Sequence, residues 1–290
     1  MKQAPLHMND VPAALLAGGL ATRLRPITDA IPKALIDVNG RPFVDHQLEL
    51  LHRHGVREVV LCLGHLGEQI ESYLGDGDSR GLRLRYSYDG DAPAGTAGAL
   101  RWALPFLGDV FWVMYGDSYM DIDYAGVLEN FWVRQTFLSA RVCERGHSCP
   151  PSDRESVRGN LERQTKSYSP PARPLGLMTV IRNDDRWDRS NVVFQDQRLC
   201  RYDKRHRVPE MRHVDYGVQL LRREALLHLA PGESADLADV YRDLTVNGQM
   251  IGHEVHNRFY EIGTPDALDE ARRFMGREQS PAGPYRRVSA

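Results

Sequence analysis

The stretch AALLAGGLATRLRPITDAIPKAL, residues 13–35, decides the fold. Its opening residues belong to the short apolar run Val11–Leu16, which predicts a buried β-strand. A glycine pair at 18–19 follows at once and indicates a turn. Backbone without Cβ atoms can approach a phosphate chain closely, and Arg23 and Lys33 supply cationic donors for the same charge. The segment therefore predicts a buried strand that leads into a phosphate-binding loop.

Neither of the two common phosphate-loop motifs is present here. No Gly-Lys-Ser/Thr follows the glycine pair, and the GxGxxG spacing of a dinucleotide-binding loop is missing. A tight turn beside two surface cations is the simpler alternative. The choice between the two depends on the rest of the chain.

Strand and helix patterns alternate through the first half of the chain. Further buried strands are predicted at Glu58–Leu63 and Val110–Tyr115, an alternating strand at Leu82–Tyr88, and helices at Phe43–His54, Leu66–Leu74 and Thr96–Leu107. Such alternation predicts a parallel sheet covered by helices on both faces.

Regular patterns return at Leu175 after an irregular middle segment. Strands are predicted at Leu177–Arg182, Asn191–Gln195, Leu199–Asp203, His213–Leu221, His253–His256 and Arg258–Ile262, and helices at Asp236–Val246 and Pro265–Phe274. Asp236 is the predicted N-cap of the first of these helices.

The middle segment 134–174 carries eight basic and four acidic residues and has weak hydrophobic periodicity. We expect a flexible surface insertion, with a basic arm for an acidic partner as the alternative. One domain, interrupted by this insertion, is then expected to span residues 1–275, and the tail 276–290 to be disordered.

Composition excludes several classes of protein. Basic and acidic residues number 37 and 39, so no strong net charge attracts nucleic acid or an anionic membrane. No apolar run is long enough to span a membrane, and Met1–Asp10 lacks the apolar core of a signal peptide. The 4 cysteines form no CxxC pair, so neither a disulfide framework nor a zinc site is expected. These features favour a cytoplasmic enzyme or binding protein.

An acidic residue follows one of the predicted buried strands. Asp117 lies just after Val110–Tyr115, and ligands of open α/β sheets bind at the carboxyl ends of strands. Mg²⁺ prefers one or two carboxylates together with phosphate oxygens. Asp117 is therefore a candidate magnesium ligand, and a helix cap or turn residue is the alternative.

These motifs together resemble the sugar-1-phosphate nucleotidylyltransferases. The likeness rests on the glycine-rich loop ending in Thr22-Arg23, the later Pro32-Lys33 and the strand-end Asp117, and covers residues 11–133 and 175–275. The heptose-1-phosphate and mannose-1-phosphate guanylyltransferases are the most similar members. Ala21 stands where the family usually has glycine, and we expect a small backbone shift to absorb its methyl group.

The resemblance implies an α/β fold, a single Rossmann-like (GT-A-like) domain whose mixed, mostly parallel sheet is flanked by helices. It implies a reaction that joins a nucleoside triphosphate, GTP favoured, to a sugar 1-phosphate with Mg²⁺ as cofactor. The implied catalytic residues are Arg23, Lys33 and Asp117, and the implied metal ligands are Asp117 and Glu261. The implied nucleotide-binding residues are Leu16, Ala17, Gly18, Gly19, Thr22, Arg23, Asp89, Gly95 and Thr96. The implied sugar-phosphate residues are Lys204, Asp203, Tyr216, Gly217 and Asn191.

Several alternatives stay open at this stage. The base can be cytosine, uracil or thymine, and the acceptor a phosphorylated amino alcohol. The chain can instead be a catalytically silent regulatory or binding homologue, or a glycosyltransferase that uses Asp121 and Asp123. We expect those two acids to start the next helix instead. No nucleic-acid or membrane partner is expected, and a homodimer is an open alternative.

Overall fold

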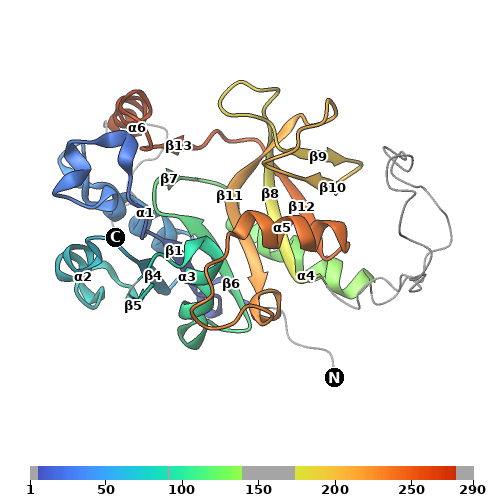
Figure 1. Cartoon of the computed structure of the whole chain (residues 1–290), viewed down its shortest axis with the longest axis horizontal. Helices are drawn as coiled ribbons and strands as arrows, with labels where there is room; N and C mark the ends of the chain where they lie inside the picture. Colours follow the sequence, from blue (N-terminus) through green and yellow to red (C-terminus); the bar gives the residue numbers. More distant parts are fainter. Residues whose placement is uncertain (1–5, 91, 139–173, 279–290) are drawn as a thin grey trace.

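The computed structural model describes residues 6–90, 92–138 and 174–278 (Figure 1). The larger part of the predicted insertion at 134–174 and of the tail at 276–290 therefore lies outside the described residues. The described margins of both are helical, because helix α4 runs over Tyr124–Leu138 and helix α6 over Pro265–Glu278.

One nine-stranded mixed sheet forms the centre of the protein (Figure 1). Its parallel part has the order β6-β1-β4-β5. These strands are β1 (Ala13–Leu16), β4 (Glu58–Leu63), β5 (Arg83–Tyr88) and β6 (Val110–Tyr115). They are the four strands expected from the patterns of the first half. Strands β1, β4 and β6 are buried because helices cover both of their faces, whereas the edge strand β5 alternates between exposed and buried residues.

Strand β11 (His213–Arg222) joins the second half of the chain to the first, because it pairs antiparallel with β6. The remaining strands of the sheet are β8 (Gly176–Arg182), β9 (Val192–Gln195), β10 (Arg198–Tyr202) and β12 (Met250–Val255). Two short antiparallel pairs lie outside it: β2 (Asp37–Val38) with β3 (Arg41–Pro42), and β7 (Ser118–Tyr119) with β13 (Tyr260–Glu261).

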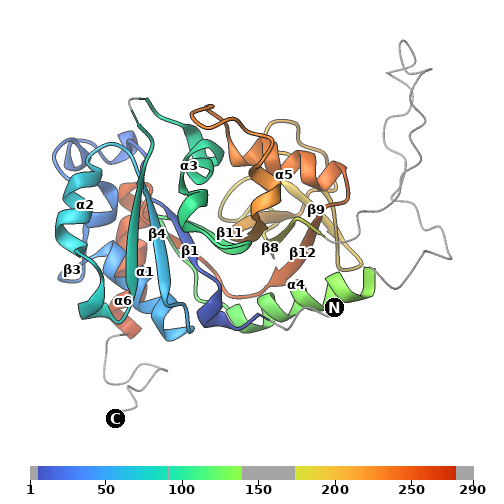
Figure 2. The same ribbon diagram turned by 90° about the horizontal axis from the view of Figure 1, so that it is seen from below.

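Helices cover both faces of the sheet, as Figure 2 shows. The helices are α1 (Phe43–Arg53), α2 (Gly67–Leu74), α3 (Gly95–Ala103), α4, α5 (Leu237–Val246) and α6. Side chains of α1, α2 and α4 share one buried cluster, and side chains of α3 and α5 share another. Single-turn 3₁₀ helices lie at Met8–Asp10, Thr22–Leu24, Ile27–Asp29, Lys33–Leu35, Asp78–Arg80, Leu104–Phe106 and Arg223–Leu226. The predicted mixed α/β sheet flanked by helices is confirmed.

A third apolar cluster packs the last helix against the early part of the chain. Leu268 and Met275 of α6 share it with Phe43 and Leu50 of α1. This packing carries β13, which precedes α6, to the same end of the sheet as β1 and β6.

Most predicted element boundaries agree with the structure to within a few residues. Asp236 is the N-cap of α5 as predicted, and its Oδ1 accepts from the Ala238 amide at 2.9 Å. The helix predicted over Thr96–Leu107 is instead α3 followed by a 3₁₀ turn, because Pro105 has no amide hydrogen to continue the α-helical ladder. None of the helices in the described part of the chain combines the length and apolar character needed to cross a membrane.

Candidate active site

The glycine-rich loop leaves β1 through a close backbone crossing. A Cβ atom added at Gly18 would lie 2.9 Å from the Gly64 amide nitrogen, whereas nothing lies within 4 Å of one at Gly19. Two backbone bonds hold the start of the loop: Ala17 N to Cys62 O at 2.9 Å, and Gly116 N to Leu16 O at 2.8 Å. Close packing against Gly64 therefore requires glycine at position 18, whereas the space beside Gly19 is open.

The next residues of the loop turn back towards the sheet. Ala21 adopts a left-handed conformation with φ of 47°, which favours glycine. Its carbonyl accepts from the Thr28 hydroxyl at 2.9 Å and from the Leu24 amide at 3.1 Å. Ala21 thus occupies a position suited to glycine, and Thr22 and Arg23 follow it on the exposed 3₁₀ turn.

Asp117 and Lys33 meet at the carboxyl end of β6. The Lys33 Nζ donates to Asp117 Oδ2 at 2.6 Å, and the Ser118 hydroxyl donates to Asp117 Oδ1 at 3.0 Å. The Ile262 amide donates to the Asp117 carbonyl at 2.9 Å, so the segment after β13 lies beside the acid. Residues far apart in the sequence are thereby brought to one point.

Gly263 marks the place where the predicted catalytic groups converge. A Cβ atom there would lie 3.5 Å from both Arg23 Nη2 and Lys33 Nζ, and 3.9 Å from Glu261 Oε2. Desolvation raises the pKa of Glu261 above its ordinary value, and repulsion from the Asp117 carboxylate raises it further. Two carboxylates and two cations therefore share one small region.

Gln47 is a site residue that the sequence interpretation missed. It is fully buried on α1, and its Nε2 donates to the carbonyls of Tyr115 at 3.0 Å and Ser118 at 2.8 Å. These bonds fix the backbone on both sides of Asp117. A signal was available, because Gln47 is a polar residue on the apolar face of a predicted helix, between Phe43 and Leu51.

Asp89 lies at the end of β5 against the glycine crossing. Its Oδ2 lies 3.5 Å from a Cβ atom added at Gly64 and accepts from the Ala94 amide at 3.3 Å. Desolvation raises the pKa of this half-buried carboxyl. No cation is paired with Asp89 in the described residues. The Asp89 carboxylate therefore lies beside the glycine-rich loop without a paired cation among the described residues.

Gly95 and Thr96 bind another segment of the protein rather than lying open. The Thr96 hydroxyl donates to Asp236 Oδ1 at 3.1 Å and accepts from the Leu237 amide at 2.8 Å. The Ala235 carbonyl accepts from the amides of Ala97 at 2.9 Å and residue 98 at 3.3 Å. The amides in the first turn of α3 therefore already have an acceptor in the segment that leads into α5.

Substituting Gly95 by alanine is expected to destabilise the protein by roughly 1–3 kcal/mol or more. Its φ is +70°, and an added Cβ would meet the Ala235 carbonyl oxygen at 2.5 Å. Gly90→Ala is the matched control, because Gly90 has a φ of +84° with nothing within 4 Å. Thermal unfolding of both variants measures the difference. Equal losses of stability would contradict a packing role for Gly95.

Lys204 reaches the site from the turn after β10. Its Nζ lies 5.8 Å from the centre of the Tyr115 ring, at the end of β6. Asp203 shapes the turn, because its Oδ1 accepts from the amides of Arg205 at 2.8 Å and His206 at 2.9 Å. Asp203 therefore supports the backbone that carries Lys204.

Strand β11 has a bulge in the stretch where the sugar-phosphate residues are predicted. The pairing of β11 with β8 shifts between Asp215 and Gln219, and Gly217 in the bulge has a φ of +98°. Asp215 Oδ1 accepts from the Gly217 amide at 3.1 Å and from Gln219 Nε2 at 2.6 Å, and Asn191 Oδ1 accepts from the Asp215 amide at 3.0 Å. Asn191 and Gly217 thus shape the bulge.

The Tyr216 side chain turns away into the core. It is only 2% exposed and packs edge-on against Phe259, with ring centres 5.5 Å apart. Alternation along a strand places neighbours on opposite faces. Asp215, which the sequence interpretation did not single out, is therefore the side chain of this stretch that lies near Lys204.

The acids Asp121 and Asp123 have structural partners. Asp121 pairs with Arg53 at 2.7 Å and with His54 at 2.9 Å. Asp123 Oδ1 accepts from the Gly126 amide at 2.9 Å at the start of α4, as expected for a helix cap. These contacts favour the expected role at the helix start over that of a glycosyltransferase metal motif.

Comparisons with known proteins agree with this geometry. Residues 13–144 match the model of the nucleotidyl transferase family. Residues 13–144 belong to that family. This nucleotidyl transferase domain contains the glycine-rich loop, Lys33, Asp89 and Asp117, whereas Lys204 and Glu261 lie beyond the matched range.

Two curated relatives are similar to part of this chain. An N-acetylmuramate α-1-phosphate uridylyltransferase of Neisseria meningitidis is 41% identical over 131 residues, covering 45% of this chain and 57% of the relative. A D-glycero-α-D-manno-heptose 1-phosphate guanylyltransferase of Campylobacter jejuni is 37% identical over 111 residues, covering 38% and 49%. The matches thus span about half the length of these relatives.

A solved structure extends the likeness in fold beyond the nucleotidyl transferase domain. The HddC protein of Yersinia pseudotuberculosis superposes with a TM-score of 0.65 at 18% identity, over 91% of this chain and 99% of that one. The second half of the chain, which carries Lys204 and Glu261, therefore has the same overall fold.

Proposed function

We propose that the protein transfers a nucleotidyl group from a nucleoside triphosphate to a sugar 1-phosphate and releases pyrophosphate. The observation that carries this proposal is the convergence of Arg23, Lys33, Asp117 and Glu261 around Gly263. The curated relatives carry out nucleotidyl transfer to phosphorylated sugars by name, one with a uridylyl and one with a guanylyl group.

The reaction depends on neutralising negative charge on the phosphates rather than on transferring a proton. A phosphate oxygen of the sugar 1-phosphate forms a bond to the α-phosphorus, and the bond from that phosphorus to the bridging oxygen of the β-phosphate breaks. The attacking oxygen is already anionic, so no general base is required. Catalysis therefore depends on aligning two anions that repel each other and on neutralising their charge.

Each cation has a role that follows from its place. Arg23 lies on the exposed turn of the glycine-rich loop, where its planar fork can hold the leaving pyrophosphate. Lys33 lies at Asp117 and supplies a point charge to the α-phosphate. Lys204 approaches from the opposite half of the sheet and holds the phosphate of the sugar.

The carboxylate pair fits a magnesium ion. Asp117 and Glu261 are close enough for repulsion to raise the pKa of Glu261, and a cation between them would relieve that repulsion. Within residues 6–90, 92–138 and 174–278, no three His, Cys, Asp or Glu side chains group to hold a metal by themselves. This agrees with Mg²⁺, which takes few carboxylates and completes its shell with phosphate oxygens and water. When bound, Mg²⁺ supplies positive charge to the phosphates.

Asp89 supports GTP as the nucleotide. Its half-buried carboxylate can accept from the adjacent N1–H and N2–H₂ donors of guanine. Uracil and thymine flank their single N–H with two carbonyl oxygens, which repel a carboxylate. Cytosine and adenine offer one exocyclic amino group without an adjacent ring N–H. A carboxylate at this position therefore favours guanine.

Pyrophosphate release from each of GTP, UTP, CTP and dTTP, with a panel of sugar 1-phosphates, tests the proposed function. GTP is expected to be used fastest, and EDTA is expected to abolish turnover. Binding of nucleotide without pyrophosphate release from any pair would instead support the alternative of a regulatory or binding homologue. A phosphorylated amino alcohol belongs in the same panel as the alternative acceptor.

Asp89→Asn is expected to reduce the preference for GTP over UTP by about tenfold or more, since one bidentate base contact contributes about 1–3 kcal/mol. The asparagine amide can accept only one of the two guanine donors. Ratios of kcat/KM for the two triphosphates measure the effect. Glu71→Gln is the control, because Glu71 lies on α2 and accepts from the Tyr88 hydroxyl. An unchanged ratio in Asp89→Asn would show that another group reads the base.

A cytoplasmic location and a homodimeric assembly stay predictions. Size-exclusion chromatography with light scattering measures the assembly directly.

A further inference from the structure

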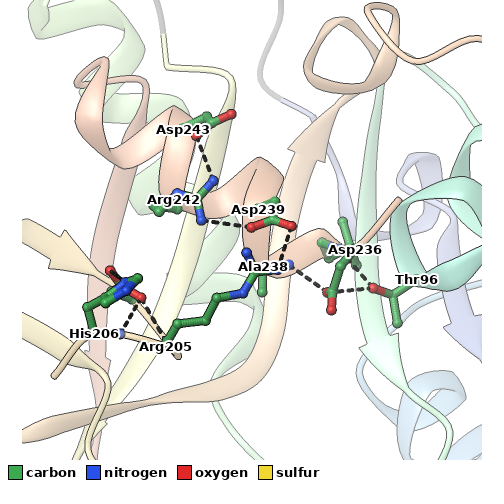
Figure 3. A network of polar contacts seen from close by, with 10 residues as sticks. Thr96, Arg205, His206, Asp236, Ala238, Asp239, Arg242 and Asp243 are labelled. Atoms are coloured by element: carbon green, nitrogen blue, oxygen red, sulfur yellow. Dashed lines mark hydrogen bonds and ion pairs between the residues drawn. The ribbon is translucent and has the colours of Figure 1, made fainter. Parts of the chain in front are cut away.

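Helix α5 is connected at its first turn to the nucleotide side of the site (Figure 3). The Thr96 hydroxyl joins α3 to this turn by donating to Asp236 Oδ1 and accepting from the Leu237 amide. The preceding residue adds backbone bonds, because the Ala235 amide donates to the Ala94 carbonyl at 2.9 Å. Ala94 in turn donates its amide to Asp89. The start of α5 is therefore fixed to the loop that carries Asp89.

The same helix is connected to the sugar-phosphate side one turn later. Asp239 of α5 pairs through Oδ2 with Arg205 Nη2 at 2.9 Å, and through Oδ1 with Arg242 Nη1 at 2.8 Å. Figure 3 shows Arg205 extending from its turn towards Asp239, with Asp236 and Thr96 further along. Arg205 directly follows Lys204, so this ion pair holds the turn from which Lys204 projects.

The position of the Lys204 ammonium group depends on how firmly its turn is held. Lysine is a point charge on a flexible four-carbon stem, and the backbone below must fix where that charge can reach. Asp203 braces the turn from within through the amides of Arg205 and His206, but this does not locate the turn relative to the nucleotide. One polar path from Lys204 to the base loop runs through α5, by way of Arg205, Asp239, Asp236 and Thr96.

We propose that α5 acts as a brace that sets the distance between the Asp89 loop and Lys204, with Thr96 and Arg205 as positioning residues. This inference rests on the proposed function. Thr96 acts through α5 rather than by touching nucleotide, and Arg205 acts through the turn rather than by touching substrate. Loss of either contact is expected to weaken the binding of sugar 1-phosphate more than that of the triphosphate.

Thr96→Val tests the first contact, because it removes the hydroxyl and keeps the side-chain shape. The KM for the sugar 1-phosphate that the wild type uses fastest is expected to rise roughly tenfold, in line with the loss of a helix-capping contact. The KM for the triphosphate and kcat at saturation are expected to change little. Thr96→Ser restores a hydroxyl and is expected to restore the KM.

Arg205→Gln tests the second contact and lies on the surface, so folding is not at risk. An exposed ion pair contributes little, and the expected rise in the same KM is about two- to fivefold. Arg242→Gln is the matched control: it removes the other partner of Asp239 from within α5 and leaves the Lys204 turn untouched. That variant is expected to keep the wild-type KM.

The outcomes separate the two proposals. A wild-type protein that releases no pyrophosphate from any substrate pair overturns the proposed function. An active wild type whose Thr96→Val and Arg205→Gln variants keep the wild-type KM for sugar 1-phosphate overturns the brace alone. Thermal unfolding shows whether Thr96→Val still folds. If it does not, the KM for sugar 1-phosphate of Arg205→Gln, compared with that of Arg242→Gln, still tests the brace.

Discussion

Replacing Asp117 by alanine is expected to reduce pyrophosphate release by at least about a hundredfold, the scale of losing one group that stabilises transition-state charge. Asp117 is the proposed magnesium ligand at the end of β6, and its carboxylate also holds Lys33 at 2.6 Å. The variant loses both the anchor for the cation and the group that orients the lysine. Steady-state pyrophosphate release at saturating magnesium measures the loss.

Asp121→Asn provides the control for that experiment. Asp121 follows the same strand but pairs with Arg53 and His54, away from the Lys33 contact. We expect turnover per folded molecule to stay near that of the wild type. A larger loss in Asp121→Asn than in Asp117→Ala would restore the glycosyltransferase alternative. Circular dichroism of both variants shows whether either loss reflects unfolding.

Arg23→Ala is expected to lower kcat by about two orders of magnitude, because the leaving pyrophosphate loses its cationic partner. Arg23 Nη2 lies 3.5 Å from the position of a Cβ atom on Gly263, within the group that contains Lys33 and Glu261. The Arg23 side chain is exposed on its 3₁₀ turn. The effect should therefore appear in turnover rather than in stability.

Arg25→Ala is the matched control in the same loop. Arg25 pairs with Asp29 at 3.1 Å, and both side chains are more than half exposed. Removing a surface pair of this kind changes stability little. Single-turnover kinetics on both variants separates chemistry from product release. Equal, small effects at positions 23 and 25 would remove Arg23 from the proposed mechanism.

The parts of the fold that the sequence predicted are those with a local cause. Adjacent residues specify the first strand and its turn: the apolar run Val11–Leu16 forms the strand, and the glycines after it form the turn. Asp236 was predicted as an N-cap because residue type and position alone suffice for that role. The same holds for Asp117, which is placed by the strand before it.

The parts that the sequence did not predict depend on distant partners. Thr96 precedes Asp236 by a long stretch of chain, and nothing near Thr96 indicates that its hydroxyl would bind the start of α5. Tyr216 was expected at the sugar, but the face of β11 that meets the site is set by the pairing of β11 with β6 and β8. Asp215 on the opposite face could be recognised only once that register was known.

The pairing of β13 with β7 has a consequence for how the protein is made. Asp117 and Glu261 are separated by about 140 residues, so a ribosome adding roughly 5–20 residues per second needs about 7–30 s to pass from one to the other. Throughout that interval the strands β1, β4, β5 and β6 can already pair, and Lys33 can already neutralise Asp117. The nascent chain can therefore form the glycine-rich loop before Glu261 has been synthesised. If the proposed function holds, catalytic competence has to wait until β13 has been synthesised and pairs with β7.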